Sequence, residues 1–504
     1  MVKYYLMQIR LRYFILAHER QFHRGLEILI GSFSWLTIAL FFAGSFLFPF
    51  QLAYIVIFFD IFWLYKSITF AVTAVVSFFR IQASQIMDWL GEVKSFPDWK
   101  KIHHVVIIPQ YKEPIHILER SIQSLVAQDF PLKQITVVMA TEARDSEGEA
   151  KANLLKEKYG KKFANFFVTV HKLIPQETAG KHSNENYAAR WVKKQLVDSG
   201  KVDINYLTIT SSDADHCFHP KHFSYLTYSF LDNPHRYFRF WEPAVLFYNN
   251  YWRLPAIIRV PNTINTIWNA AVLSRKDRLI SCQNYSLSFK LLDEVDYWNP
   301  EIIPEDYHLF FKAYYKKKGL VETEPIYLPV WADAAESTSL WKSIKNAYLQ
   351  YQRWDWGISD DPNVIKNYFL EPTISFWDKT VRLIKLLEDH LLMPVNWFLI
   401  TLGITIPSLL IPKFSQTALG YNLPRLSSLI LTICAIFLAI IYLVNLKLRP
   451  PRPSHVSPLR SLLIPLEFIL MPIVGFIFNV LPSLDAHTRL MLGKYIEYRV
   501  TEKV

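Results

Sequence analysis

Residues 205–220 read NYLTITSSDADHCFHP, and the rest of the chain is organised around this stretch. Residues 206–210 are mostly β-branched or aromatic, which predicts a short buried strand. Two carboxylates, Asp213 and Asp215, follow the strand closely. In an open α/β sheet this carboxyl edge is where ligands bind, and two carboxylates one residue apart are able to hold a hard divalent cation with the phosphates that it bridges. The competing interpretation is an Asx-rich turn before a helix that has Pro220 in its first turn.

Strand-like and helix-like segments alternate upstream of this stretch. Strand patterns occur at 105–108, 135–139 and 166–170, and helical patterns occur at 115–127, 147–159 and 184–196. Such an alternation indicates a parallel sheet with crossover helices. Downstream the regularity fades, although 303–318 and 340–356 are predicted to be helical and 320–330 to be extended.

Apolar residues are concentrated at the two ends of the 504-residue chain, which is 51% hydrophobic and therefore apolar for a soluble enzyme. Residues 28–50 and 53–79 are candidate membrane spans joined by a short turn, because a spanning helix needs about 20 apolar residues. Residues 376–391 form an amphipathic, interfacial pattern. Further candidate spans are 392–411, 426–444 and 462–481. Pro465 and Pro472 favour a broken or re-entrant last segment with the basic tail inside, whereas three full spans would put that tail outside.

The distribution of charge predicts the orientation and the partners of the chain. Basic residues flank the first hairpin on both sides, so the N-terminus and the middle of the chain are expected in the cytoplasm. The net charge of +11 is scattered around apolar segments, which favours contact with membrane lipids over nucleic acid. The three cysteines have no metal-ligand spacing, which indicates a reduced compartment without disulfides. No cleaved signal peptide is expected. We expect an integral protein of the cell (plasma) membrane with a cytoplasmic catalytic domain.

These patterns divide the chain into seven parts. They are a basic cytoplasmic N-terminus (1–27), a transmembrane hairpin (28–80), an interfacial lead-in (81–103), an α/β domain (104–357), a linker with an interfacial helix (358–391), C-terminal membrane segments with two or three spans (392–482) and a basic tail (483–504).

Two polar groups besides the aspartates lie in the first half of the predicted α/β domain. The first strand ends in IIPQYKEP (107–114), where Tyr111 offers a ring face for a base and Glu113 offers a hydrogen-bond acceptor. The segment AGKHSNEN (179–186) places Lys181 at a helix start, where a lysine is able to neutralise a diphosphate. An ordinary loop and a solvated lysine are the competing interpretations.

Two more polar groups follow the aspartates. Glu305 and Asp306 begin a predicted helix, where capping competes with a role as general base toward an acceptor hydroxyl. The segment QYQRW (350–354) contains Arg353, which is able to clamp phosphate oxygens, and Trp354, which is able to stack on a sugar ring.

All five groups in this order resemble the membrane-embedded family 2 glycosyltransferases, which include cellulose, hyaluronan and chitin synthases and resemble ceramide glucosyltransferase. The resemblance covers about 105–357, half of the chain, and the flanking apolar segments are similar to the architecture of the family. It implies an α/β GT-A (Rossmann-like) domain flanked by α-helical transmembrane segments, a nucleotide-sugar donor, Mg²⁺ or Mn²⁺ as cofactor and inversion at the anomeric carbon.

The resemblance also implies a role for each matched residue. The nucleobase would be held by Tyr111 and Glu113, the diphosphate by Lys181, the nucleotide by Asp213 and the metal by Asp215. Asp306 would be the catalytic base, with Glu305 beside it on the donor side. Gln350, Arg353 and Trp354 would close over the pyrophosphate and the acceptor, and SCQN (281–284) stands in place of the acceptor-side loop.

Two departures from the family pattern affect the donor site. The usual acidic pair after the second strand is replaced by MATEARD (139–145), in which Glu142 is the candidate for the missing base contact. Lys112 stands where the family often has Asn. The identity of the nucleotide therefore stays open.

The sequence leads to one main functional hypothesis and two alternatives. The main hypothesis is an inverting glycosyltransferase that transfers a sugar from a nucleotide-sugar, expected to be a UDP-sugar, to a growing polysaccharide. The second is a single transfer to a lipid acceptor. The third is a membrane transporter or scaffold with a nucleotide-sensing domain, for which Asp60 and Lys66 within a span are the argument. The sequence does not indicate the oligomeric state.

Overall fold

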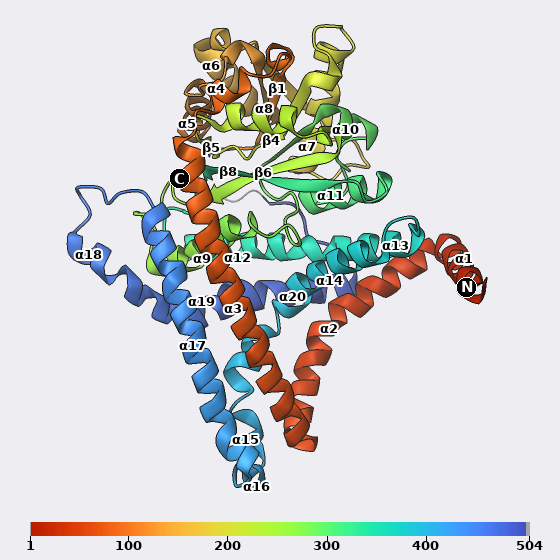
Figure 1. The fold of residues 1–504 in the computed structure, drawn as a ribbon, viewed down its shortest axis with the longest axis vertical. Helices are drawn as coiled ribbons and strands as arrows, with labels where there is room; N and C mark the ends of the chain where they lie inside the picture. Colours follow the sequence, from red (N-terminus) through yellow and green to blue (C-terminus); the bar gives the residue numbers. More distant parts are fainter. Residues whose placement is uncertain (1, 500–504) are drawn as a thin grey trace.

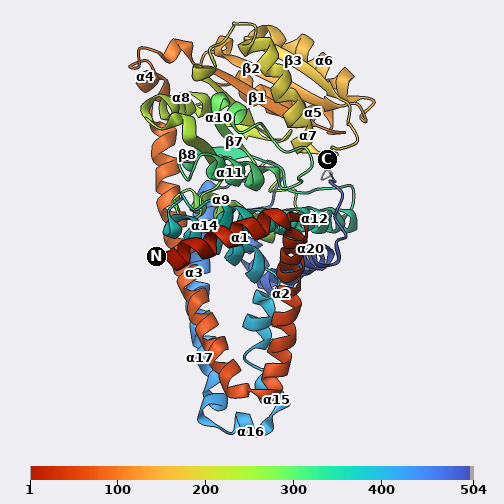
Figure 2. The same ribbon diagram turned by 90° about the vertical axis from the view of Figure 1, so that its right-hand side faces the viewer.

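An α/β domain lies above a bundle of long helices in the computed structural model, which describes residues 2–499 (Figures 1 and 2). Met1 and residues 500–504 of the predicted basic tail, Lys503 among them, lie outside the described residues. The predicted fold class, a Rossmann-like α/β domain flanked by apolar helices, is confirmed.

The first half of the sheet has the predicted parallel topology. Its strands lie in the order β3-β2-β1-β4 and are parallel to their neighbours. These strands are β1 (His103–Gln110), β2 (Ile135–Glu142), β3 (Asn165–His171) and β4 (Leu207–Ser211). The crossover helices are α5 (Ile115–Val126), α6 (Gly148–Tyr159) and α7 (Lys181–Val192). β2 and β4 are buried along their whole length, as is typical of a parallel sheet covered on both faces.

The second half of the sheet is mixed, which the sequence did not predict. β7 (Tyr285–Ser288) is antiparallel to both β4 and β6 (Arg239–Leu246), and β6 is parallel to β8 (Glu322–Trp331). β5 (Cys217–Phe218) pairs with the end of β8. β6 contains charged residues and a proline, and β7 is only four residues long, so neither has the apolar pattern by which a strand is found.

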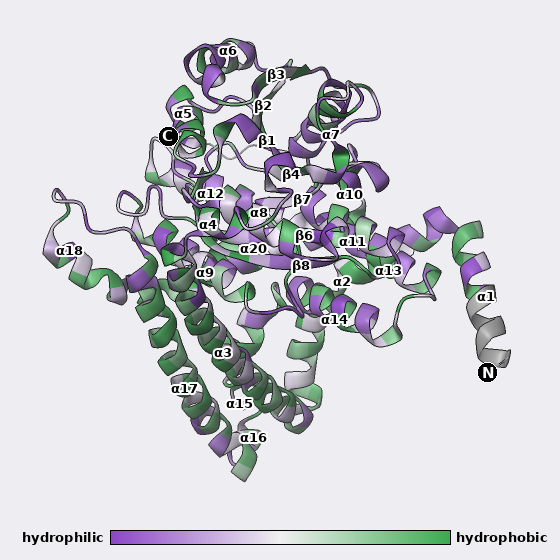
Figure 3. Ribbon diagram, turned by 45° about the horizontal axis from the view of Figure 1, so that its top comes forward, coloured by the Kyte–Doolittle hydropathy of each residue, from purple (hydrophilic) through white to green (hydrophobic). Residues whose placement is uncertain are grey.

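Four helical segments of the described chain are long and apolar enough to cross a membrane. They are α2 (Glu19–Leu47), α3 (Pro49–Ile86), α17 (Ala418–Leu448) and the helical run Pro458–Leu492. Figure 3 shows that α3 and α17 are largely hydrophobic, whereas the α/β domain has many hydrophilic segments. α2 and α3 are joined at Phe48, as expected for a hairpin.

Two of the three predicted C-terminal spans, 392–411 and 462–481, are interrupted. α14 (Phe376–Leu392) precedes a π-helical turn at Phe398–Leu402 and the short α15 (Ile406–Leu410). The run from 458 to 492 consists of α18 (Pro458–Leu463), α19 (Met471–Gly475) and α20 (Leu481–Leu492), with 3₁₀ and π turns between them. Pro465 and Pro472 lie at these breaks, so the predicted interruption is present. The number of spans and the side of the tail stay predictions.

The remaining helices lie beside the sheet, in the bundle or between the two (Figure 1). They are α1 (Val2–Ala17), α4 (Trp89–Val93), α8 (His222–Asp232), α9 (Ala256–Val272), α10 (Phe289–Glu294), α11 (Glu305–Lys316), α12 (Leu340–Asp355), α13 (Asp361–Leu370) and α16 (Pro412–Ser415).

Candidate functional site

The predicted site residues gather around two adjoining cavities at the carboxyl edge of the sheet. The first, here the Asp213 cavity, is lined by Tyr111, Glu113, Glu142, Lys181, Asp213, Asp215, Gln350, Arg353 and Trp354. The second, here the Asp306 cavity, has a volume of about 300 Å³ and contains Glu305 and Asp306 in its wall. Lys181, Asp213, Gln283, Arg353 and Trp354 line both cavities, so the two spaces meet.

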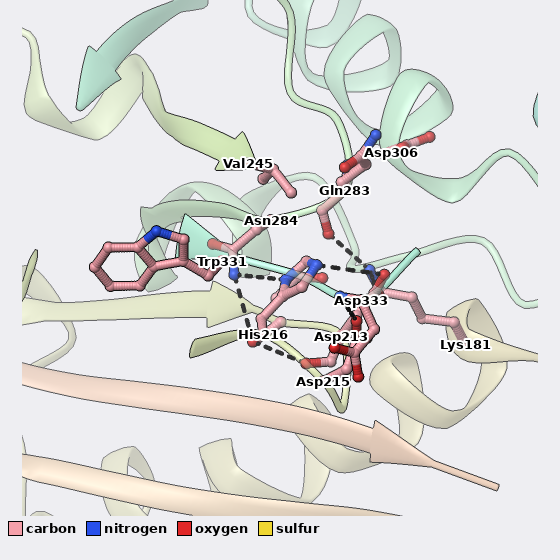
Figure 4. A network of polar contacts seen from close by, with 12 residues as sticks. Lys181, Asp213, Asp215, His216, Val245, Gln283, Asn284, Asp306, Trp331 and Asp333 are labelled. Carbon is pink, nitrogen blue, oxygen red and sulfur yellow. Dashed lines mark hydrogen bonds and ion pairs between the residues drawn. The ribbon is translucent and has the colours of Figure 1, made fainter. Parts of the chain in front are cut away.

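The turn after β4 brings Asp213, Asp215 and His216 together (Figure 4). The backbone N–H of His216 donates to the carbonyl of Asp213 over 3.1 Å, so the chain turns here. α8 begins at His222, so Pro220 precedes the helix and is not in its first turn, as the competing interpretation expected. One ligand atom from each of the three side chains lies within 4.8 Å of the others. Two carboxylates and an imidazole at this spacing are able to hold a divalent cation.

His216 and Asp333 are site residues that the sequence analysis missed. The Asp333 backbone N–H donates to Oδ2 of Asp215 over 2.7 Å, and the Asp333 carboxylate pairs with Arg120 over 2.6 Å. Asp333 thereby orients the buried carboxylate of Asp215, although Asp333 itself is not one of the three clustered residues. His216 could have been found, because it directly follows the Asp-x-Asp motif. Asp333 has no such signal, since only the end of β8 brings it to the site.

Lys181 is one of two cations, with Arg353, that line both cavities, and it begins α7, as predicted. Its Nζ lies 2.8 Å from Oδ1 of Asp213 and 3.5 Å from Oε1 of Glu305, and it donates to the carbonyl of Gln283. Burial alone would lower the pKa of Lys181, but the carboxylates of Asp213, Glu185 and Glu305 raise it well above its ordinary value. The ammonium group therefore stays charged, and its partners are Asp213, Glu305 and the carbonyl of Gln283.

Glu185 is a buried carboxyl group one turn after Lys181, and it predicts a pH dependence of stability. Its Oε1 accepts from Ser211 Oγ over 2.6 Å, and burial raises its pKa to about 8, although Lys181 acts in the opposite direction. A raised pKa means that the folded state binds the proton more tightly. The tighter binding of this proton stabilises the folded state. The stabilisation is complete below about pH 4.5 and is lost as the pH rises through about 8.

We therefore expect the free energy of unfolding to fall between about pH 5 and about pH 8, with a contribution from this proton of up to ~1.4 kcal/mol per pH unit. In the Glu185→Gln variant this part of the slope should vanish. Thermal unfolding of both proteins in detergent across the pH range measures it. Identical slopes in the two proteins would show that Glu185 is not the group responsible.

Asp306 lies at the start of α11 and faces the segment that precedes β7. Its Oδ2 accepts from the backbone N–H of Gln283 over 3.2 Å, and its Oδ1 accepts from the N–H of Tyr307 over 2.8 Å. Asp306 therefore contacts the backbone of its own helix and also orients the 281–284 segment. Burial raises the pKa of the neighbouring Glu305 to about 7, which Lys181 counteracts and Asp306 reinforces.

The end of β1 and the end of β2 form the far wall of the Asp213 cavity. The backbone N–H of Tyr111 donates to Oε2 of Glu113 over 2.5 Å. The guanidinium of Arg144 pairs with Glu142 and lies 4.8 Å from the ring centre of Tyr111. Arg144 thus lies between Glu142 and Tyr111, and the candidate base contact Glu142 is already paired with a cation that the sequence analysis did not consider.

The QYQRW segment is the last turn of α12 and contacts the C-terminal segment of the chain. Nη1 of Arg353 donates to the hydroxyl of Tyr498 over 2.9 Å, and the guanidinium lies 4.9 Å from the centre of the Tyr498 ring. Trp354 packs on Tyr351 at 5.0 Å between ring centres. Tyr498 lines the Asp213 cavity and was not predicted, because it is far from every motif in the sequence.

Gly180 allows Tyr498 to approach the site. Its φ is +154°, and a Cβ atom there would lie 2.7 Å from Cγ of Tyr498 and 2.8 Å from Cε1 of His182. We expect Gly180→Ala to displace the segment 494–499 and to increase the rate at which trypsin cleaves after Lys494 and Arg499, which are exposed in the wild type as well. The Tyr498→Ala variant serves as the reference background: it lacks the ring that a Cβ atom at position 180 would meet, so Gly180→Ala should add little to its cleavage rate. Cleavage at equal rates in wild type and Gly180→Ala would contradict this account.

The sequence matches no protein-family profile and no curated protein. The structure is similar to the mannosyltransferase PcManGT from Pyrobaculum calidifontis in complex with GDP-Man and Mn²⁺, with 11% identity and a TM-score of 0.44 over 84% of this chain and 100% of that chain. It is also similar to S. aureus TarS 1–349 in complex with UDP-GlcNAc, with 15% identity and a TM-score of 0.38 over 79% of this chain and 93% of that chain. For the UDP complex of the same TarS fragment the identity is 12%, the TM-score 0.38 and the coverage 79% and 94%.

Proposed function

We propose that this protein is an inverting membrane glycosyltransferase of the family 2 type that transfers a sugar from a nucleotide-sugar, with a growing polysaccharide as the acceptor expected from its motifs. The observation that carries the proposal is the meeting of the two cavities. Lys181, Asp213 and Arg353 line the space of the acid cluster and also the space of Asp306.

The groups on each side of this junction suit the two halves of the reaction. On the donor side, Lys181 and Arg353 would bind the diphosphate, while Tyr111, Glu113 and Glu142 would contact the nucleobase. Asp215, Asp213 and His216 would hold Mg²⁺ or Mn²⁺, which would neutralise charge on the departing diphosphate.

Asp306 would act on the acceptor side. Its carboxylate takes the proton of an acceptor hydroxyl, whose oxygen bonds to the anomeric carbon as the bond from that carbon to the diphosphate breaks. The nucleoside diphosphate leaves with the bonding electrons, next to the charged Lys181. Gln350, Arg353 and Trp354 would position the pyrophosphate and the acceptor sugar.

The size and solubility of the product test the proposal. Purified protein in liposomes is given labelled nucleotide-sugars with Mg²⁺ or Mn²⁺, and the label is then separated by chromatography. High-mass, water-soluble label is the result expected for a polysaccharide, and one species in the organic phase would indicate transfer to a lipid. If no nucleotide-sugar in the panel loses its sugar, the transporter or scaffold hypothesis replaces this one.

A further inference from the structure

Two consecutive aspartates at the start of α13 each hold a histidine by its Nδ1 atom. Oδ1 of Asp360 lies 2.8 Å from Nδ1 of His308, and Oδ1 of Asp361 lies 2.8 Å from Nδ1 of His390. Both aspartates are buried, with exposures of 3% and 0%. The two histidines face different spaces, because His308 lines a cavity between α11 and α13 whereas His390 lines the Asp306 cavity. The second pair therefore adjoins the candidate site.

His390 reaches the Asp306 cavity from α14, which lies with α12 and α13 between the α/β domain and the long helices (Figure 1). Its ring meets that of Tyr307 at 5.9 Å between centres, and Tyr307 directly follows Asp306. Gly357 leaves room for the imidazole, since a Cβ atom there would lie 3.2 Å from Nε2. Because Asp361 occupies Nδ1, Nε2 is the ring nitrogen that remains for a ligand.

Asp355 offers a second polar group to the same cavity. It is the last residue of α12, directly after Trp354, and it lines the Asp306 cavity. Its Oδ2 atom is buried and has no hydrogen-bond partner among the described residues. A buried carboxyl oxygen without a partner is costly. A ligand hydroxyl that donates to Oδ2 would remove this cost.

The charges around His390 favour its protonated form. Burial alone would lower the pKa of His390, but Asp361 raises it above its ordinary value, with further contributions from Asp389 and Asp355. Asp389 also pairs with Arg278. Burial raises the pKa of Asp355 well above its ordinary value, which the charge on His390 counteracts. The imidazolium is thus able to donate from Nε2 beside a carboxyl group that accepts.

The charges of the cavity lining nearly balance. The three cationic side chains of the lining, Lys181, Arg353 and His390, already contact Asp213, Tyr498 and Asp361. Five carboxyl groups face them, and burial raises the pKa of two of these, Glu305 to about 7 and Asp355 further. A phosphate or a uronate would therefore find no cation without a partner among the described residues of this lining.

The uncharged part of the lining suits a sugar. It includes aromatic rings and amides, among them those of Trp268, Tyr351, Asn265 and Asn479. Aromatic faces pack on the apolar side of a sugar ring, and amides both donate to and accept from hydroxyl groups. The cavity volume of about 300 Å³ leaves space for such a ring beside His390.

We propose that His390 is an acceptor-binding residue, held in place by Asp361, and that together with Asp355 it selects an uncharged saccharide. Nε2 of His390 would donate to one hydroxyl group, Asp355 would accept from another, and the reacting hydroxyl would face Asp306. Asp361 would be a positioning residue, because it fixes the imidazole through Nδ1. This inference rests on the proposed function and deepens it by naming the residues that choose the acceptor.

Binding of disaccharides to the full-length protein in nanodiscs tests the proposal without requiring turnover. The uncharged probes are cellobiose, lactose, maltose and N,N′-diacetylchitobiose, and cellobiuronic acid is the anionic probe. Calorimetric titration gives the affinity of each. We expect one uncharged disaccharide to bind ~10-fold or more tightly than cellobiuronic acid, because the anion would lie beside carboxyl groups without gaining a free cation.

Two substitutions of His390 separate ligand binding from a structural role. In His390→Asn the amide nitrogen takes the place of Nδ1 and keeps the bond to Asp361, but Nε2 is lost. In His390→Gln the amide nitrogen takes the place of Nε2, but the bond to Asp361 is lost. We expect His390→Asn to weaken disaccharide binding ~10-fold or more, as for a lost hydrogen bond from a charged donor, and His390→Gln by no more than about threefold.

The matched pair of His308 and Asp360 supplies the control. His308→Asn removes the same ring nitrogen beside a buried aspartate, but outside the Asp306 cavity, so it should bind the disaccharide as wild type does. All variants should bind nucleoside diphosphate with Mn²⁺ as wild type does, which shows that they fold.

The outcomes separate this inference from the proposed function. If His390→Gln binds the disaccharide no more tightly than His390→Asn, His390 serves to fasten α14 to α13 and the proposal is overturned. Cellobiuronic acid binding as tightly as the best uncharged probe would overturn the selection of an uncharged saccharide, and wild type that binds none of the probes would overturn the acceptor site. Wild type that binds disaccharide but no nucleotide would contradict the proposed function and leave the saccharide result standing.

Discussion

Sugar transfer by the Asp306→Asn variant is expected to fall by a factor of ~10²–10⁴, the usual contribution of a general base. Asparagine keeps the shape of the side chain and can still accept the hydrogen bond from the N–H of Gln283, which spans 3.2 Å in the wild type. It cannot take a proton from the acceptor hydroxyl. The affinity for the nucleotide-sugar should change little, because the donor contacts lie in the Asp213 cavity.

The rate of transfer at saturating donor measures this effect, together with the donor affinity from a titration. Glu301→Gln is a suitable control, because Glu301 is an exposed carboxylate shortly before the start of α11. Transfer at the wild-type rate by Asp306→Asn would remove Asp306 from the reaction. Glu305, whose pKa is raised to about 7 by burial, would then be the next residue to replace.

The Asp215→Ala variant is expected to lose metal-dependent donor binding, with a decrease in affinity of ~10–100-fold or more. Asp215 is 1% exposed, and its carboxylate is oriented by the N–H of Asp333. Its removal takes one of three candidate ligands from the cluster and leaves the Asp333 N–H without this acceptor. The metal should therefore no longer increase nucleotide affinity.

Titration of nucleoside diphosphate with and without Mn²⁺ measures the coupling between metal and nucleotide. Asp232→Ala, which removes an exposed carboxylate from α8, should retain the wild-type coupling. If Asp215→Ala retains it as well, the metal is bound elsewhere and the Asp213, Asp215 and His216 cluster has another role.

The parallel half of the fold could be predicted from the sequence because its strands and helices have regular patterns. The runs at 105–108, 135–139 and 166–170 consist mostly of apolar and β-branched residues, and they correspond to β1, β2 and β3. β6 could not be predicted, because Arg239 and Glu242 interrupt its apolar pattern and their burial depends on partners from distant segments. Arg239 pairs with Glu322 and Glu324 of the adjacent β8, and Glu242 accepts from the N–H of Cys282.

The sequence predicted those residues of the candidate site that lie at strand ends or within recognisable motifs. Asp213, Lys181 and Arg353 are far apart in the sequence, but each belongs to a recognisable pattern, and the structure brings them to the same cavity. Their chemical roles stay predictions. Tyr498 and Asp333 reach the site only through tertiary structure, the first through the segment after α20 and the second through β8. No local pattern in the sequence could have identified them.

The most direct test of the proposed activity compares two amounts in one reaction: nucleoside diphosphate released and sugar attached to the acceptor. Purified wild-type protein in liposomes is incubated with a panel of nucleotide-sugars, with Mn²⁺ or with a chelator. We predict that one nucleotide-sugar yields both products in equal amounts, that the chelator abolishes both and that Asp306→Asn lowers both. If every nucleotide-sugar in the panel stays intact in the presence of metal, the chain is not a glycosyltransferase of this kind.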